Sequence, residues 1–159
     1  MRYISKLTFF ALFVLILSPA MGAAGNKKIT TSECSKPALI LNVVDGYYGD
    51  LDNDGVSDDV YGKVTVDLMC ANRFRFDYKI TLTLPSGFQT SDYLSINTRL
   101  HALVFETVFY NYALESGDYI ISAEGLLSTG GLSYTYSDII FDPPGGVTGT
   151  GSTITTVSY

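Results

Sequence analysis

The most chemically distinctive part of the chain is an acidic loop over residues 50–59, with the sequence DLDNDGVSDD. It holds five of the 16 acidic residues, and carboxylates this close repel one another unless water or a cation neutralises them. Aspartates alternate with other residues up to Gly55 at the sixth position, where glycine permits a sharp turn that makes alternate side chains converge. Oxygen ligands without His or Cys favour Ca²⁺ over zinc or copper. The loop therefore predicts one calcium site; the alternative is an acidic surface loop that binds nothing.

The pattern DxDxDGxxD resembles the calcium loops of dockerins, thrombospondin type 3 repeats and the FG-GAP repeats of integrin-like propellers. In those families loop positions one, three, five and nine bind Ca²⁺ through side chains, and position seven binds it through its carbonyl. The resemblance implies as ligands Asp50, Asp52, Asp54, Asp58 and the Val56 carbonyl. Asp59 is expected to face solvent or to support a ligand. Tyr61 stands where an EF-hand has its bidentate Glu, and a strand follows in place of a helix.

Catalytic patterns are weak. Paired carboxylates for glycosidase chemistry would have to come from Glu106, Glu115 and Glu124, but the sequence gives no reason to bring any two together. His101 has no G-x-S-x-G partner for a Ser/His/Asp arrangement, so a packed or surface histidine is favoured. Several tyrosines could stack on sugars, but without any Trp a role in the core is favoured for them: Tyr47, Tyr48, Tyr61, Tyr110, Tyr112, Tyr134 and Tyr136. The sequence therefore predicts a protein that is not an enzyme.

Alternation of apolar and polar residues is the main structural signal. Residues 74–84 alternate without exception, which indicates a strand with one face in a core and one in water. Residues 63–70 behave in the same way, and the short link 71–73 predicts a hairpin between the two. Residues 100–114 are apolar on both faces, so a helix stays possible, although their β-branched and aromatic content favours a buried strand. Further strands are expected at Ala38–Tyr47, Tyr93–Thr98, Asp118–Leu126 and Leu132–Phe141.

About seven short strands separated by Gly, Pro and Ser turns predict a single all-β domain, an antiparallel immunoglobulin-like β-sandwich. The segment Gly117-Asp118-Tyr119 resembles the tyrosine corner of such sandwiches, in which Tyr119 would bond to backbone upstream of its strand. The buried Trp of antibody domains is absent, so the resemblance is to the architecture alone. The chain from Asp45 through the DPPGG segment is also similar to small, uncharacterised secreted domains of archaeal surface proteins.

The N-terminus has the order of a secretory signal peptide, which predicts an extracellular protein. Arg2 and Lys6 precede eleven largely apolar residues and a small-residue stretch that ends at Ala24. Eleven residues are short for a membrane span, so cleavage is favoured over an uncleaved anchor. Removing residues 1–24 leaves eight basic and 16 acidic side chains, a net charge of −8 that argues against nucleic acid and anionic lipid as partners. The sequence after residue 24 contains no second long apolar run, so no membrane span is predicted there.

The two cysteines, Cys34 and Cys70, are expected to form a disulfide because the chain is bound for an oxidising compartment; two separately buried thiols are the alternative.

Residues 25–36 are expected to be an N-terminal segment, and residues 37–144 are expected to be the sandwich domain. Residues 145–159 form a tail in which a Gly/Thr/Ser-rich linker precedes a strand-like segment, 153–159. A frayed end is favoured for that segment. It could instead complete the parent sheet or pair with a neighbouring molecule.

These features together predict a secreted, calcium-stabilised, non-catalytic module for cell-surface binding or adhesion, whose partner is an unidentified cell-surface protein or glycan. The first alternative is a subunit of an extracellular filament that self-associates by strand donation through its C-terminal tail. A secreted hydrolase is the second.

Overall fold

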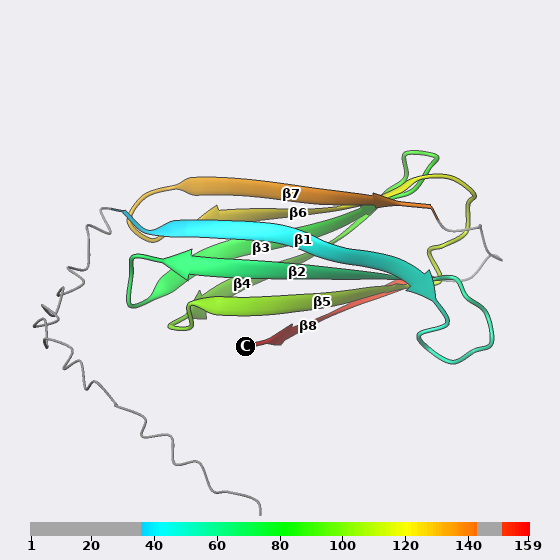
Figure 1. Ribbon diagram of the computed structural model, residues 1–159, viewed down its shortest axis with the longest axis horizontal. Helices are drawn as coiled ribbons and strands as arrows, with labels where there is room; N and C mark the ends of the chain where they lie inside the picture. The colour runs from blue at the N-terminus through cyan, green and yellow to red at the C-terminus, as the bar shows by residue number, and fades with distance from the viewer. Residues whose placement is uncertain (1–35, 143–150) are drawn as a thin grey trace, which may run out of the picture. The chain divides into compact units, whose positions relative to one another are not determined.

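The computed structural model describes residues 36–142 and 151–159, which form eight strands and no helix. The strands are β1 (Ala38–Gly49), β2 (Asp59–Met69), β3 (Phe74–Thr83), β4 (Gln89–Thr98), β5 (Ala102–Tyr110), β6 (Tyr119–Leu127), β7 (Ser133–Phe141) and β8 (Ser152–Ser158). They make two antiparallel four-stranded sheets, ordered β1-β2-β5-β8 and β4-β3-β6-β7 (Figure 1). The predicted all-β sandwich is confirmed, with eight strands in place of about seven. Within the described stretches no helix is long and apolar enough to cross a membrane.

The strand order follows the immunoglobulin arrangement closely. Immunoglobulin domains place strands A, B, E and D in one sheet and C, F and G in the other. Here β1, β2 and β5 take the places of A, B and E, and β3, β6 and β7 take those of C, F and G. The place of strand D beside β5 is filled by β8, which comes from the C-terminal end of the chain.

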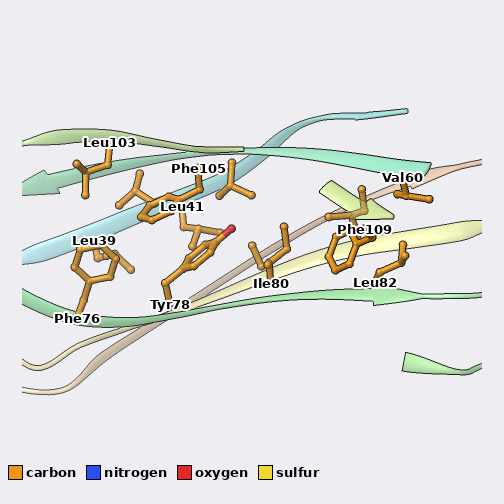
Figure 2. Close-up of a cluster of buried hydrophobic side chains, with 14 of the residues drawn as sticks. Leu39, Leu41, Val60, Phe76, Tyr78, Ile80, Leu82, Leu103, Phe105 and Phe109 are labelled. Carbon is orange, nitrogen blue, oxygen red and sulfur yellow. The ribbon is translucent and has the colours of Figure 1, made fainter. Parts of the chain in front are cut away.

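The core lies between the inner faces of the two sheets (Figure 2). The core face predicted from the alternation of residues 74–84 is confirmed, because Phe74, Phe76, Tyr78, Ile80 and Leu82 are all buried, although Thr81 on the other face is buried too. The Tyr78 ring stacks on Phe105 of the opposite sheet with ring centroids 4.2 Å apart. Burying an aromatic side chain contributes about 2–3 kcal/mol, so this central pair is a main source of cohesion between the layers.

The predicted hairpin between residues 63–70 and 74–84 is wrong. These residues belong to β2 and β3, which lie in different sheets, so the link between them crosses from one layer to the other. Cys70 has φ 71°, a left-handed conformation that turns the chain out of the first sheet. A strand with one buried face shows the same alternation whether its neighbour lies beside it or across the core. The alternation therefore carried no information about the pairing.

The ambiguous segment 100–114 contains strand β5 (Ala102–Tyr110) and no helix, in agreement with its β-branched and aromatic composition. It pairs with β2 on one side and β8 on the other, which makes it a central strand. Its inward side chains, among them Phe105 and Phe109, are buried in the core, whereas Val104, Glu106 and Val108 on the outer face are half-buried.

The predicted tyrosine corner is present at the start of β6. The Tyr119 hydroxyl donates to the backbone carbonyl of Glu115 at 2.9 Å and accepts from the Glu115 amide at 2.7 Å. Tyr119 is itself fully buried. The ring therefore fixes the turn that leads the chain into β6.

The end of the chain is a strand, so the favoured expectation of a frayed terminus is wrong. β8 pairs antiparallel with β5, from Ser152 opposite Tyr110 to Ser158 opposite Val104. The Thr155 hydroxyl donates to Asp92 Oδ2 of β4 at 2.6 Å and lies 2.9 Å from the Thr107 hydroxyl. β8 therefore completes the sheet of its own chain, which is one of the two alternatives to a frayed end that the sequence left open. The predicted signal peptide and residues 143–150, which include most of the predicted linker, lie outside the described residues.

Candidate metal site in the acidic loop

The acidic loop, residues 50–59, connects β1 to β2. The two strands pair up to Gly49 and Asp59, so the loop is closed at its base by the sheet. This closure brings residues nine positions apart in the sequence into one compact turn.

Aspartate side chains curl the loop by bonding to its own backbone. Asp50 Oδ2 accepts from the Gly55 amide at 3.1 Å, Asp52 Oδ1 from the Asp54 amide at 3.1 Å, and Asp54 Oδ1 from the Val56 amide at 2.8 Å. Such turns are the usual behaviour of Asp side chains in loops. Gly55 has φ 92°, which confirms the sharp turn expected at this glycine.

Asp59 anchors the loop to the sandwich, and the expectation that it could face solvent is wrong. Its side chain is 0% exposed. Its Oδ2 accepts from the amides of Leu51 at 2.7 Å and Asp52 at 3.1 Å, and its Oδ1 accepts from the amide of Asn111 at 2.9 Å. Because Asn111 follows β5, Asp59 ties the loop to the neighbouring strand of the sheet.

Three carboxylates converge in the loop. Asp50, Asp52 and Asp59 each offer an oxygen within 4.8 Å of those of the other two. Of the expected ligands, the structure thus brings Asp50 and Asp52 together, with Asp59 as the third member. The side chains of Asp54 and Asp58 lie outside this group.

Two buried carboxylate oxygens of the loop have no hydrogen-bond partner, namely Asp50 Oδ1 and Asp58 Oδ1. Asp58 is only 3% exposed. Burial raises the pKa of Asp58, and the charges of Asp54, Asp59 and Asp52 raise it further. A buried carboxylate oxygen without a donor is costly, because the charged form loses its hydration and gains nothing in return.

The sequence around the loop offers no positive charge to compensate. No Lys or Arg occurs between Lys36 and Lys63. Both ion pairs found within the described residues join charges of the sheets, Lys63 with Glu106 at 3.1 Å and Lys79 with Glu124 at 3.7 Å. The orphaned oxygens of Asp50 and Asp58 and the all-oxygen donor set fit a hard divalent cation such as Ca²⁺.

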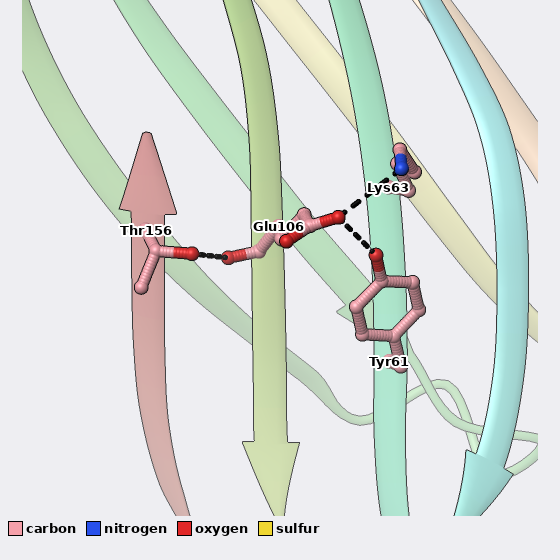
Figure 3. A network of polar contacts seen from close by, with 4 residues as sticks. All are labelled: Tyr61, Lys63, Glu106 and Thr156. Carbon is pink, nitrogen blue, oxygen red and sulfur yellow. Dashed lines mark hydrogen bonds and ion pairs between the residues drawn. The ribbon is translucent and has the colours of Figure 1, made fainter. Parts of the chain in front are cut away.

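The other chemistry-bearing residues do not assemble. Glu106 lies on the outer face of the β1-β2-β5-β8 sheet, where it accepts from Tyr61 and pairs with Lys63 (Figure 3). Glu124 belongs to the opposite sheet, and Glu115 accepts from the amide and hydroxyl of Ser86. His101 lies edge-on to Phe74, with its Nδ1 2.9 Å from the Leu68 carbonyl, as expected for a packed histidine.

The cysteine pairing stays a prediction, because Cys34 lies outside the described residues. Cys70 follows β2 at the crossing to the second sheet. A bond between the two would tie the N-terminal segment to this crossing.

Comparison with known proteins does not place the chain in a family. No protein-family model matches it, and neither a curated protein nor a solved structure shows a significant match. The resemblance of residues 50–59 to dockerin, thrombospondin type 3 and FG-GAP loops stays a prediction from the sequence pattern.

Proposed function

We propose that the protein is a secreted, calcium-stabilised β-sandwich module that acts in binding or adhesion at the cell surface. The observation that carries the proposal is the pair of buried, unpartnered carboxylate oxygens, Asp50 Oδ1 and Asp58 Oδ1, in a loop where Asp50, Asp52 and Asp59 converge. A cation in the loop would offset their desolvation and mutual repulsion.

Calcium suits the loop better than other metals. All available side-chain ligands are carboxylates, and carboxylate oxygens with flexible spacing are what Ca²⁺ prefers. Because both oxygens of Asp59 already accept backbone hydrogen bonds, Asp59 supports the loop while Asp50 and Asp52 are the main candidate ligands. Asp54, Asp58 and the Val56 carbonyl complete the set that the sequence pattern implies.

The role of the cation is structural. Asp59 links the loop to Asn111 after β5, so a metal that orders the loop also stabilises the edge of the sheet there. A ligand that binds only the folded form, present at about ten times its Kd, stabilises that form by about 1.4 kcal/mol. Extracellular calcium modules bind with Kd of about 10⁻⁴–10⁻³ M, so millimolar Ca²⁺ is the relevant range.

Thermal unfolding of the purified chain in millimolar Ca²⁺ and in chelator tests the proposal. At about one to ten times its Kd, millimolar Ca²⁺ should raise Tm by about 2–6 °C. Asp52→Asn should lose most of that rise, whereas Asp67→Asn, a change at an exposed aspartate on β2, should keep it. Equal Tm values for the wild type in both buffers would refute the calcium role.

A filament subunit is the second candidate, and the character of β8 favours it. None of the β8 side chains is buried, so this strand is held mainly by backbone hydrogen bonds to β5 and by the Thr155 contacts. An edge strand held in this way could equally be supplied by a neighbouring copy. Sedimentation of the mature chain and of a chain ending at Asp142 decides: high-mass assemblies that disappear with the tail support donation, and monomers in both cases exclude it.

A secreted hydrolase stays the third candidate. A hydrolysis screen with glycan and peptide substrates tests it directly. Turnover that is lost when one carboxylate is changed would replace the binding role with an enzymatic one.

A further inference from the structure

The outer face of the β4-β3-β6-β7 sheet carries a row of side chains that runs across all four strands. Strand register places Tyr93 opposite Lys79, Lys79 opposite Glu124, and Glu124 opposite Tyr136. With strands about 4.8 Å apart, the row is about 14 Å long. A tyrosine thus stands on each edge strand, and the Lys79–Glu124 ion pair lies between them.

The surface is hollowed beside this row. The hollow has a volume of about 270 Å³, and its lining includes Asp77, Lys79, Glu124, Leu126 and the rings of Tyr93 and Tyr134. Tyr93 is 67% exposed, Tyr134 61% and Tyr136 50%, so the expectation that Tyr134 and Tyr136 belong to the core is wrong. The volume is slightly below the range of about 300–1,000 Å³ for small-ligand pockets, so the hollow suits one unit of a longer molecule.

On the opposite outer face, by contrast, two tyrosine rings pack against each other. There Tyr47 stacks on Tyr61 with centroids 4.6 Å apart, and the Tyr61 hydroxyl donates to Glu106 at 2.9 Å. Within the described part of the chain, neither Tyr93 nor Tyr134 stacks on another ring. The Lys79 ammonium lies 5.5 Å from the centroid of the Tyr93 ring, a cation–π contact that holds this ring at the edge of the hollow.

We propose that this tyrosine-flanked face binds a neutral oligosaccharide laid across the strands. The C–H faces of pyranose rings are apolar and pack against the negative faces of aromatic rings. Between the rings, Lys79 donates hydrogen bonds while Asp77 and Glu124 accept them, which matches hydroxyl groups that do both. The charge of the face indicates the class of ligand. Asp77 and Glu124 outweigh the single amine of Lys79, and the chain as a whole is acidic, so phosphates, sulfates and nucleic acid are disfavoured.

The inference goes beyond the proposed function by naming a ligand class and a surface for the binding role. It does not depend on the acidic loop, which connects β1 and β2 of the other sheet. Calcium binding can therefore fail while sugar binding stands, and the reverse holds equally.

Calorimetric titration of the mature chain in millimolar Ca²⁺ tests it, with neutral hexasaccharides of glucose, mannose, xylose and N-acetylglucosamine as probes. We expect at least one of them to bind. Tyr93→Ala and Tyr134→Ala should each weaken that binding about tenfold or more, as truncation of an aromatic anchor does. Tyr47→Ala, the matched control on the opposite face, should leave it unchanged, and unchanged Tm values would show that the variants fold.

Three outcomes overturn the inference. They are absence of binding to all four probes at millimolar concentration, binding that survives both tyrosine changes, and tighter binding of a sulfated hexasaccharide than of its neutral counterpart. Asp52→Asn, examined under conditions where it is folded, should bind the sugar like the wild type. A parallel loss in that variant would place the sugar at the acidic loop and would also contradict the inference.

Discussion

Glu106 on the β1-β2-β5-β8 sheet and Asp58 in the acidic loop lie in opposite electrostatic surroundings. Hydrogen bonds from Tyr61 and Lys63 lower the pKa of Glu106 (Figure 3). Burial and the charges of Asp54 and Asp59 raise the pKa of Asp58. The sheet thus supplies its own counterion to its carboxylate, whereas the loop gathers carboxylates without one. The calcium proposal rests on this difference, because a cation from solution would supply the charge that the loop lacks.

The largest expected effect comes from removing the carboxylate that organises the loop. Asp59→Ala leaves the part-buried amides of Leu51, Asp52 and Asn111 without this acceptor, and we expect a loss of about 3 kcal/mol in the free energy of unfolding. Chemical denaturation in Ca²⁺ and in chelator measures it. The loss should occur in both buffers, because Asp59 holds the backbone as well as the site. Stability like that of Asp67→Ala would contradict this anchoring role.

A change at Asp58 sharpens the contrast between the loop and the sheet, because its sign should depend on calcium. In chelator, Asp58→Asn removes a buried charge that neighbouring aspartates repel, so the variant should unfold at a higher temperature than the wild type. In Ca²⁺ the same change removes a candidate ligand, so the gain should shrink or reverse. A lower Tm in chelator would mean that Asp58 is not electrostatically strained.

The pH dependence of this effect follows from the raised pKa. A carboxyl group whose pKa is higher in the folded state favours folding in its protonated form. In chelator, the contribution of Asp58 to the free energy of unfolding should therefore fall as pH rises from about 4. Asp58→Asn should flatten that part of the stability profile. An identical profile for the variant and the wild type would count against the raised pKa.

The smallest effect is expected at Glu106. Its pKa is lowered, so its contribution to stability is present above the unfolded pKa of about 4.5 and is lost as pH falls through the folded value. The Lys63–Glu106 pair is partly exposed, and such pairs contribute little and are screened by salt. Glu106→Gln should therefore lower Tm slightly at neutral pH, and less in high salt. A fall in stability as large as that of Asp59→Ala would contradict the proposed difference between the sheet and the acidic loop.

The sequence predicted the features that depend on local pattern and missed those that depend on which segments meet. Alternation in residues 74–84 and the turn at Gly55 follow from side-chain period and backbone freedom, and both are confirmed. The sheet assignment of β2 and β3 depends on partners far along the chain, so the predicted hairpin was wrong. The strand propensity of residues 153–159 was recognised, but a frayed end was favoured, because the order of β8 comes from pairing with β5 and from Thr155, which no local pattern contains.

The acidic loop shows the same division. The spacing of its aspartates predicted convergence, and Asp50 and Asp52 do converge. The part played by Asp59 depends on the Asn111 amide, 52 positions away, which no local pattern contains. The one available signal was the adjacent pair Asp58-Asp59 at the start of a strand, where two neighbouring carboxylates cannot both be placed favourably without partners.

The number of Ca²⁺ ions bound per chain tests the central claim most directly. Calorimetric titration of the calcium-free protein lacking residues 1–24 should give one site with a Kd of about 10⁻³ M or tighter. Asp50→Asn should abolish or strongly weaken it, and Asp67→Asn should leave it intact. Absence of any saturable calcium site in the wild type, or a site that Asp50→Asn leaves unchanged, would contradict the claim that solution calcium neutralises the acidic loop.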